Sequence, residues 1–112
     1  VVGVRLTIDQ KDHEGLKSDE MPHVAKVTAD QGLVDYLNLT AGTSAGLAGS
    51  TQIVPPMSFE TALSPLAATI KACVDVPVFV AGRINQPQIA ESILASGQAD
   101  MCGVTRALIA ER

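Results

Sequence analysis

The sequence predicts an α/β fold that makes up half of a TIM (β/α)8 barrel, with four short parallel strands separated by helices. Apolar runs of strand length alternate with stretches of helical periodicity along the whole chain. This order indicates a parallel sheet with right-handed crossovers, either in a barrel or in an open doubly wound sheet. The first strand is followed by IDQKDHEG and not by the G-x-G-x-x-G motif of a dinucleotide-binding open sheet, which favours the barrel.

The first third of the chain supplies two strands and one helix. Residues 1–7 (VVGVRLT) are β-branched and apolar, as expected for a strand covered on both faces. After a polar loop, Ser18 is expected to cap a helix that begins at Asp19 and ends at Gly32. Residues 34–39 (VDYLNL) form the second strand.

The rest of the chain repeats the alternation twice. Residues 40–56 are rich in Gly, Ser and Thr, and a loop of that length in a compact domain is usually functional or disordered. In the helix that follows the third strand, Ile89, Ile93 and Leu94 are expected to face the core. The expected elements are a helix over 63–73, a strand over 77–81, a helix over 87–96, a strand over 100–103 and a short helix over 105–111.

Composition bounds the function. The 112 residues match one domain, and the chain opens inside a strand, so we expect a piece of a longer, cytoplasmic protein without signal peptide or membrane span. A net charge of −4 without a basic patch and an aromatic content of 3% argue against nucleic-acid and membrane partners. Cys73 and Cys102 lack metal-ligand spacing, and we expect buried free thiols and no metal site.

Two strand ends share one chemistry. The third strand is followed by Gly82 and Arg83, and the fourth ends at Gly103, with Thr105 and Arg106 just beyond it. A glycine lets the backbone approach a ligand, and a helix that starts after it aims its amides at the same place. One Gly-Arg pair is most often an ordinary turn. Two pairs on neighbouring strands predict a phosphate site, in the place where barrel enzymes hold phosphate.

These residues resemble a known family. Residues 76–112 (VPVFVAGRINQPQIAESILASGQADMCGVTRALIAER) are similar to the end of the flavin-binding barrel of the Old Yellow Enzyme family. The closer resemblance is to its larger members: 2,4-dienoyl-CoA reductase, trimethylamine dehydrogenase and related amine demethylases. Residues 2–6 (VGVRL) resemble the family's fifth strand, Glu14-Gly15 its following loop, and residues 34–39 its sixth strand. The resemblance covers nearly the whole chain and implies strands five to eight, the C-terminal half of an FMN-binding barrel.

The resemblance also implies roles for individual residues. Arg5 would face the pyrimidine edge of the flavin and stabilise the negative charge that develops there on reduction. Asn38 and Thr40, at the open end of the sixth strand, would face the substrate, whereas His13 and His23 are expected to be surface histidines. The phosphate pocket would be formed by Gly82, Arg83, Gly103, Thr105 and Arg106.

The function implied is that of an FMN-dependent oxidoreductase with hydride transfer at flavin N5 and a small-molecule amine or enoyl substrate. Residues 42–50 carry no charge to grip a nucleotide tail, which favours an amine over an acyl-CoA. Larger members also carry a 4Fe–4S cluster and FAD or a second nucleotide, outside this chain. Two alternatives remain open. One is a phosphate-binding barrel enzyme without flavin. The other is an inactive half-barrel that forms homo-oligomers through its exposed strand edges.

Overall fold

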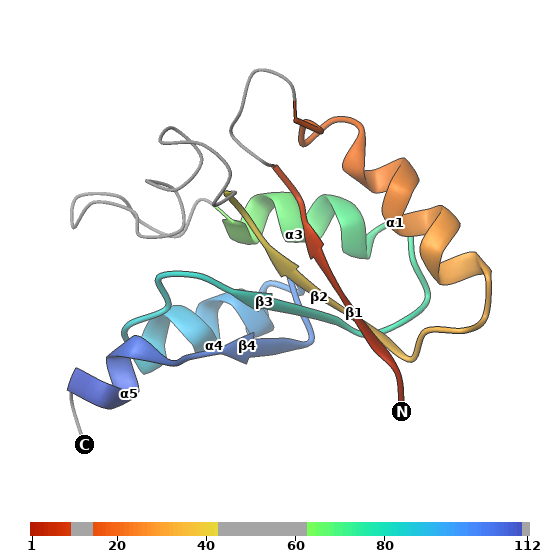
Figure 1. The fold of residues 1–112 in the computed structure, drawn as a ribbon. Coiled ribbons are helices and arrows are strands. Elements are labelled where there is room, and N and C mark those ends of the chain that lie inside the picture. The colour runs from red at the N-terminus through yellow and green to blue at the C-terminus, as the bar shows by residue number, and fades with distance from the viewer. Residues whose placement is uncertain (10–14, 43–62, 111–112) are drawn as a thin grey trace.

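The computed structural model describes residues 1–9, 15–42 and 63–110, and within them it forms one four-stranded parallel sheet (Figure 1). The strands lie in sequence order, β1-β2-β3-β4, and every pair is parallel, as predicted. The strands are β1 (Gly3–Thr7), β2 (Tyr36–Thr40), β3 (Val78–Ala81) and β4 (Met101–Gly103). The helices are α1 (Met21–Asp30), α3 (Leu63–Lys71), α4 (Pro87–Ala95) and α5 (Arg106–Ala110).

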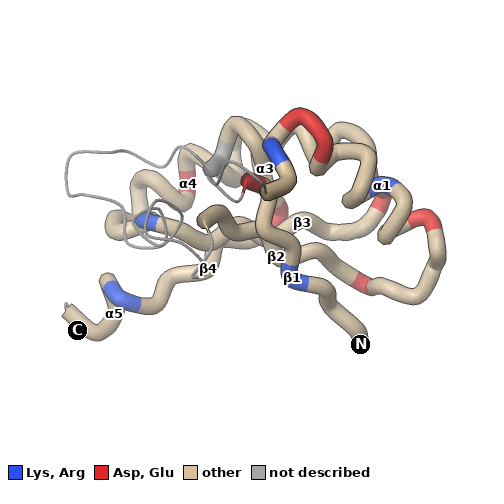
Figure 2. Tube along the Cα trace, turned by 45° about the horizontal axis from the view of Figure 1, so that its top comes forward, with Lys and Arg blue, Asp and Glu red and all other residues tan. Residues whose placement is uncertain are grey.

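Helices α1, α3 and α4 lie on one side of the sheet, and the core is between them and the strands (Figure 2). Side chains alternate between the two faces of a strand, and one residue in two therefore points to the helices. In the central strands β2 and β3 these are Leu37, Leu39, Val78 and Val80, each at most 1% exposed. The helices contribute Ala25, Ala67, Ile70 and Ile93 to the same core.

The opposite face of the sheet is not covered by any described helix. It carries Arg5, Tyr36, Asn38, Phe79 and Met101, which alternate with the core residues. The ring of Tyr36 stacks on that of Phe79 with centroids 4.7 Å apart. It also lies over Gly3, where a Cβ would overlap the ring atoms. In a complete barrel this face points inward.

Helix α1 begins later than predicted, because Ser18 does not cap it. Glu20 is the N-cap residue and makes no side-chain cap hydrogen bond. Its carboxylate instead accepts from the Lys17 amide at 2.9 Å. Pro22, in the first turn, lacks an amide hydrogen, and its fixed φ suits a helix start. The predicted end is confirmed, since Gly32 has a φ of +68° beyond the last turn.

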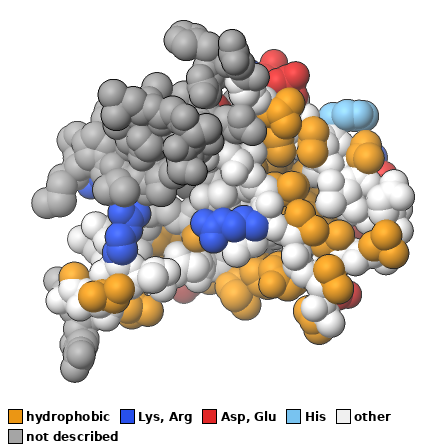
Figure 3. Space-filling model, viewed as in Figure 1, with side chains coloured by type: hydrophobic (Ala, Val, Ile, Leu, Met, Phe, Trp, Pro, Cys, Tyr) orange, Lys and Arg blue, Asp and Glu red, His pale blue; other side chains and the backbone are white. Residues whose placement is uncertain are grey.

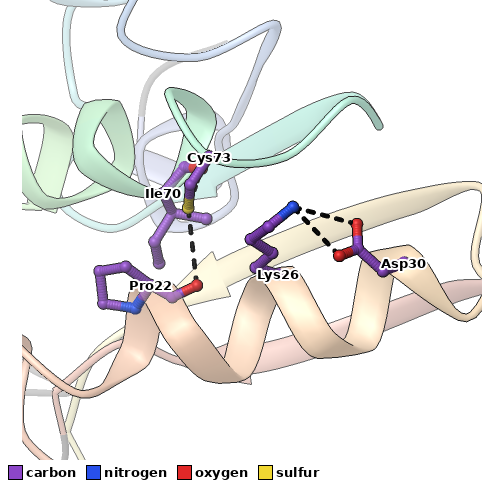
Figure 4. A network of polar contacts seen from close by, with 5 residues as sticks. All are labelled: Pro22, Lys26, Asp30, Ile70 and Cys73. Carbon is purple, nitrogen blue, oxygen red and sulfur yellow. Dashed lines mark hydrogen bonds and ion pairs between the residues drawn. The ribbon is translucent and has the colours of Figure 1, made fainter.

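Two further expectations are corrected. Leu94 does not face the core, because it is 40% exposed on α4, whereas Ile93 is buried at 4%. Cys73 and Cys102 are free, but each is half-buried instead of buried. Cys73 bridges α1 and α3: its Sγ lies 3.5 Å from the carbonyl oxygen of Pro22 and 3.0 Å from that of Ile70 (Figure 4).

Two ion pairs join or brace these elements. On α1, Lys26 pairs with Asp30 at 3.0 Å, four residues along the helix, and the hydrogen bond to Asp30 raises the pKa of Lys26 (Figure 4). At the end of α3, the Lys71 ammonium donates to Asp100 at 2.7 Å. The second oxygen of Asp100 accepts from the Val78 amide at 2.8 Å. Asp100 therefore ties α3 to β3 and β4.

No helix within the described ranges is long and apolar enough to cross a membrane.

Candidate functional site

The C-terminal ends of the four strands present small side chains on the uncovered face. Thr7 ends β1 and pairs with Thr40 at the end of β2. Ala81 ends β3 and pairs with Gly103 at the end of β4. Two residues earlier on the same face the side chains are larger: Arg5 pairs with Asn38, Asn38 with Phe79, and Phe79 with Met101. These four small residues, Thr7, Thr40, Ala81 and Gly103, form the C-terminal edge of the uncovered face, which we call the shelf, and Arg5 lies beside it.

Arg5 is exposed on this face, on the edge strand β1. Its neighbour Asn38 is half-buried on β2, and its Oδ1 atom is buried without a hydrogen-bond partner in the part of the chain that the structure describes. A buried carbonyl oxygen without a donor is uncommon in folded proteins. Asn38 and Thr40 lie on the face where the sequence predicts a ligand, at alternate positions along β2.

The corner after β3 has an unusual backbone. Gly82 has a φ of 141° and Arg83 a φ of 52°. Left-handed backbone is costly for a residue with a side chain, and it is concentrated at functional sites. Ile84, which follows, is buried at 4% exposure and anchors the corner in the core. The corner therefore places the Arg83 backbone in a strained conformation at the C-terminal end of β3.

The corner after β4 differs in its physical basis. A Cβ at Gly103 would lie 3.1 Å from Cβ of Ala81, a tight contact that disfavours a larger residue because β3 passes close by. The approach of a ligand, which the sequence suggests as a reason for this glycine, stays a prediction. Thr105 and Arg106 follow as exposed residues, and Arg106 is the first residue of α5.

The structure brings five of the predicted site residues together and keeps Arg5 apart from them. Gly82 and Arg83 follow Ala81, which pairs with Gly103, so the two corners are neighbours; Thr105 and Arg106 continue from the second. Arg5 lies on the other edge strand, two strand spacings from the corner after β3 and three from the corner after β4, or about 10 to 14 Å. A ligand that contacts both must be elongated along the C-terminal edge of the sheet.

Basic side chains lie near the middle of this face. Figure 3 shows Lys and Arg side chains lying on it between hydrophobic groups, with acidic side chains near its margins. The chain as a whole has a net charge of −4, so this local distribution opposes the overall charge. It suits an anionic ligand.

Some sequence-based interpretations lie outside the described residues. They concern His13, Glu14 and the 43–62 segment, which contains nearly all of the stretch used to weigh an amine against an acyl-CoA. His23 is exposed on α1, as expected for a surface histidine.

Sequence reasoning missed three features near the site. Tyr36 and Phe79 received no role in the sequence analysis. Each is one residue away from a core residue of its own strand, which places its ring on the uncovered face. Asp9 was assigned to a polar loop, but it is only 8% exposed. Its carbonyl oxygen accepts from the Gly42 amide at 2.8 Å, which joins the segments after β1 and β2.

Cys102 does not belong to the site. Its side chain points to the helix-covered face, with Sγ 3.9 Å from the Ala90 carbonyl oxygen. Burial raises the pKa of this thiol, so it stays protonated at neutral pH and is a poor nucleophile.

Known proteins resemble the chain over nearly its whole length. No protein-family model matches it. An N,N-dimethylglycine/sarcosine dehydrogenase of Chromohalobacter salexigens is 34% identical over 99% of this chain and 16% of that protein. A multifunctional alkene reductase/demethylase, OYE, of Caballeronia cordobensis is likewise 34% identical over 99% of the chain and 16% of its own length.

A solved structure shares the fold. A 2-naphthoyl-CoA reductase in complex with 2-naphthoyl-CoA superposes with a TM-score of 0.72 at 25% identity, over 88% of this chain and 15% of that one. The four parallel strands are thus a fragment of a TIM-barrel enzyme, and the chain spans about a sixth of the length of the relatives that it matches. By sequence and by fold, the chain belongs to the Old Yellow Enzyme-like NADH:flavin oxidoreductase family, as a segment of its barrel.

Proposed function

We propose that this chain is strands five to eight of an FMN-binding barrel and supplies the phosphate pocket and one ring contact of an FMN-dependent oxidoreductase. The observation that carries the proposal is the layout of the C-terminal edge. Two glycine-containing corners lie together at one end, Arg5 lies about 10 to 14 Å away at the other, and small side chains lie between. This spacing suits an elongated ligand with an anionic group at one end and a planar polar ring.

The residues present fit FMN. The side chains of Thr7, Thr40, Ala81 and Gly103 are small, as a site for a planar ring needs, and a larger residue at Gly103 would press on Ala81. The strained corner at Gly82 and Arg83 and the residues Thr105 and Arg106 would hold the phosphate through amides, a hydroxyl and a guanidinium. FMN, when bound, supplies hydride transfer at its N5 atom.

Arg5 would act on the ring end of the site. Its guanidinium is permanently charged and stands on the uncovered face, beside the shelf. A fixed positive charge there favours the form of a ligand that carries more negative charge. Arg5 would therefore stabilise reduced FMN more than oxidised FMN. Thr40, on the next strand, would face the substrate.

The visible absorption spectrum of the complete protein tests this function. Flavin absorbs in the visible, and heat release followed by chromatography separates FMN from FAD. We expect the parent to retain FMN and Arg106→Ala to bind it more weakly. A colourless protein that does not take up added FMN would contradict the proposal and favour a barrel enzyme that binds a substrate phosphate at the same corners.

The substrate is proposed as a small amine or an enoyl compound. The relatives include an N,N-dimethylglycine/sarcosine dehydrogenase and an alkene reductase/demethylase, and the solved neighbour is a 2-naphthoyl-CoA reductase. Anaerobic mixing of the oxidised protein with N-methyl amines tests the first class by bleaching of the flavin. Mixing of the reduced protein with enoyl compounds tests the second by its reoxidation.

A further inference from the structure

Asn38 occupies a position where an apolar side chain would fit. It stands in a row across the uncovered face, between Arg5 on β1 and Phe79 on β3, with Met101 beyond. Phe79 and Met101 show that this row accepts apolar side chains. Asn38 is half-buried, and its Oδ1 atom is buried without a hydrogen-bond partner among the described residues. An unpaired buried acceptor lowers the stability of the fold unless a donor reaches it, for example when a ligand is bound.

Arg5 is the neighbour that can supply the donor. It lies directly opposite Asn38 in the parallel ladder, on a strand about 4.8 Å away, and both side chains are on the same face. Its guanidinium carries five N–H donors in a planar fork and no acceptor. Phe79, the neighbour on the other side, has no donor. An exposed Arg side chain can turn toward Asn38 when a ligand displaces water from the sheet face.

We propose that Asn38 is a positioning residue for Arg5. With a ligand on the uncovered face, Oδ1 of Asn38 accepts one N–H of the Arg5 guanidinium and holds the fork so that its other edge faces the ligand. Asn38 then acts on the ligand through Arg5. The inference rests on the proposed function, in which Arg5 faces the ring of FMN.

The test is a double-mutant cycle on the FMN reduction potential in the complete, FMN-loaded protein. Asn38→Leu keeps the side-chain size and removes the acceptor. It is expected to lower the preference for reduced over oxidised FMN about three- to tenfold, the range of one hydrogen bond. A tenfold change corresponds to about 30 mV for a two-electron couple. In an Arg5→Ala background, Asn38→Leu should change nothing further.

Two controls separate this role from a general effect on the fold. Tyr36→Phe removes a hydroxyl from the same strand and face, and it should leave the potential unchanged. Asn38→Ala removes the same oxygen and should behave as Asn38→Leu does, which covers the case that leucine disturbs folding. The hydrogen exchange of the Arg5 side-chain N–H, followed by NMR, should slow more on FMN binding in the parent than in Asn38→Leu.

The outcomes separate the two claims. A complete protein that binds no FMN overturns the proposed function and this inference together. Bound FMN whose potential responds additively to the Arg5 and Asn38 substitutions, or Arg5 exchange that is equal with and without Asn38, overturns the inference and leaves the proposed function standing.

Discussion

Two arginines hold charge at opposite ends of the site, and the difference in position predicts a difference in role. Arg106 begins α5, next to the β3 and β4 corners, whereas Arg5 stands on the far edge strand. A phosphate carries its charge in both redox states of FMN, so a contact to it stabilises both. A contact to ring atoms that become more negative on reduction stabilises mainly the reduced state.

Arg106→Ala should therefore weaken FMN binding without moving the potential. Loss of one hydrogen bond to a charged group costs about 1.5–3 kcal/mol, which is about 10- to 150-fold in dissociation constant. Titration of FMN into apo-protein measures it. Arg5→Ala, the matched comparison, should lower the potential more than it weakens binding of oxidised FMN. Unchanged FMN affinity in Arg106→Ala would remove Arg106 from the phosphate pocket.

Gly3 and Tyr36 predict an effect on stability. A Cβ at Gly3 overlaps the Tyr36 ring, which is held against Phe79 by stacking. Gly3→Ala should destabilise the protein by about 1–3 kcal/mol, as overpacking does. In a Tyr36→Ala background the same substitution should be neutral or slightly stabilising, because the ring is gone. Urea denaturation of the four variants measures both, and equal penalties in the two backgrounds would show that the overlap is not the cause.

The residue types of the site could be predicted from the sequence, but atomic burial could not. The Gly-Arg pairs mark strand ends by themselves, because glycine and a polar residue follow an apolar run. The Oδ1 atom of Asn38 is buried without a partner among the described residues, and its neighbours Arg5 and Phe79 come from strands distant in sequence. The close passage of Ala81 against Gly103 likewise follows from strand pairing and not from the residues near Gly103.

At the scale of elements, the type and order of every described helix and strand could be predicted, as could the end of α1 at Gly32, whereas the start of α1 could not. Periodicity marks the middle of an element, while its ends depend on hydrogen bonds that compete locally. At the start of α1, the Lys17 amide donates to the Glu20 carboxylate, and the N-cap residue is Glu20 in place of Ser18. The Lys71–Asp100 contact joins residues 29 positions apart, so no local pattern announces it.

That contact predicts how stability depends on pH. The Lys71 ammonium, followed by the Val78 amide, lowers the pKa of Asp100 below its usual 3.8. A carboxyl with a lowered native pKa adds stability above the unfolded-state pKa and loses it as the pH falls through the native pKa. Asp100→Asn should cost about 1 kcal/mol at neutral pH, since the pair is partly exposed.

Urea denaturation of the parent and Asp100→Asn over a pH series measures the difference. It should be constant at and above neutral pH and disappear at pH values below the native pKa of Asp100. Glu91→Gln, on the exposed side of α4, is the matched control and should show no such difference. A penalty for Asp100→Asn that persists in acid would mean that packing and not charge is responsible.

At the scale of the whole molecule, the sheet has helices on one face and two edges without a neighbouring strand. β1 and β4 each pair on one side only within the described residues. A parallel sheet is normally covered on both faces, and unpaired edges invite strands from another chain. Eight strands close a barrel, and two copies of four would meet that number, with β4 of one beside β1 of the other.

The isolated 112-residue chain should therefore self-associate, and Met101 gives a way to test the surface used. Met101 is 52% exposed, on β4 and on the uncovered face. Met101→Lys would place an unpaired ammonium between the copies, which costs several kcal/mol, so association should weaken by about 100-fold or more. The monomer should keep its melting behaviour, because the substituted side chain is already exposed.

Leu94→Lys, on the helix-covered side, should leave association unchanged. Sedimentation velocity over a concentration series measures the association of both variants. A parent chain that sediments as a monomer and melts cooperatively would show that the four strands are stable without a second copy.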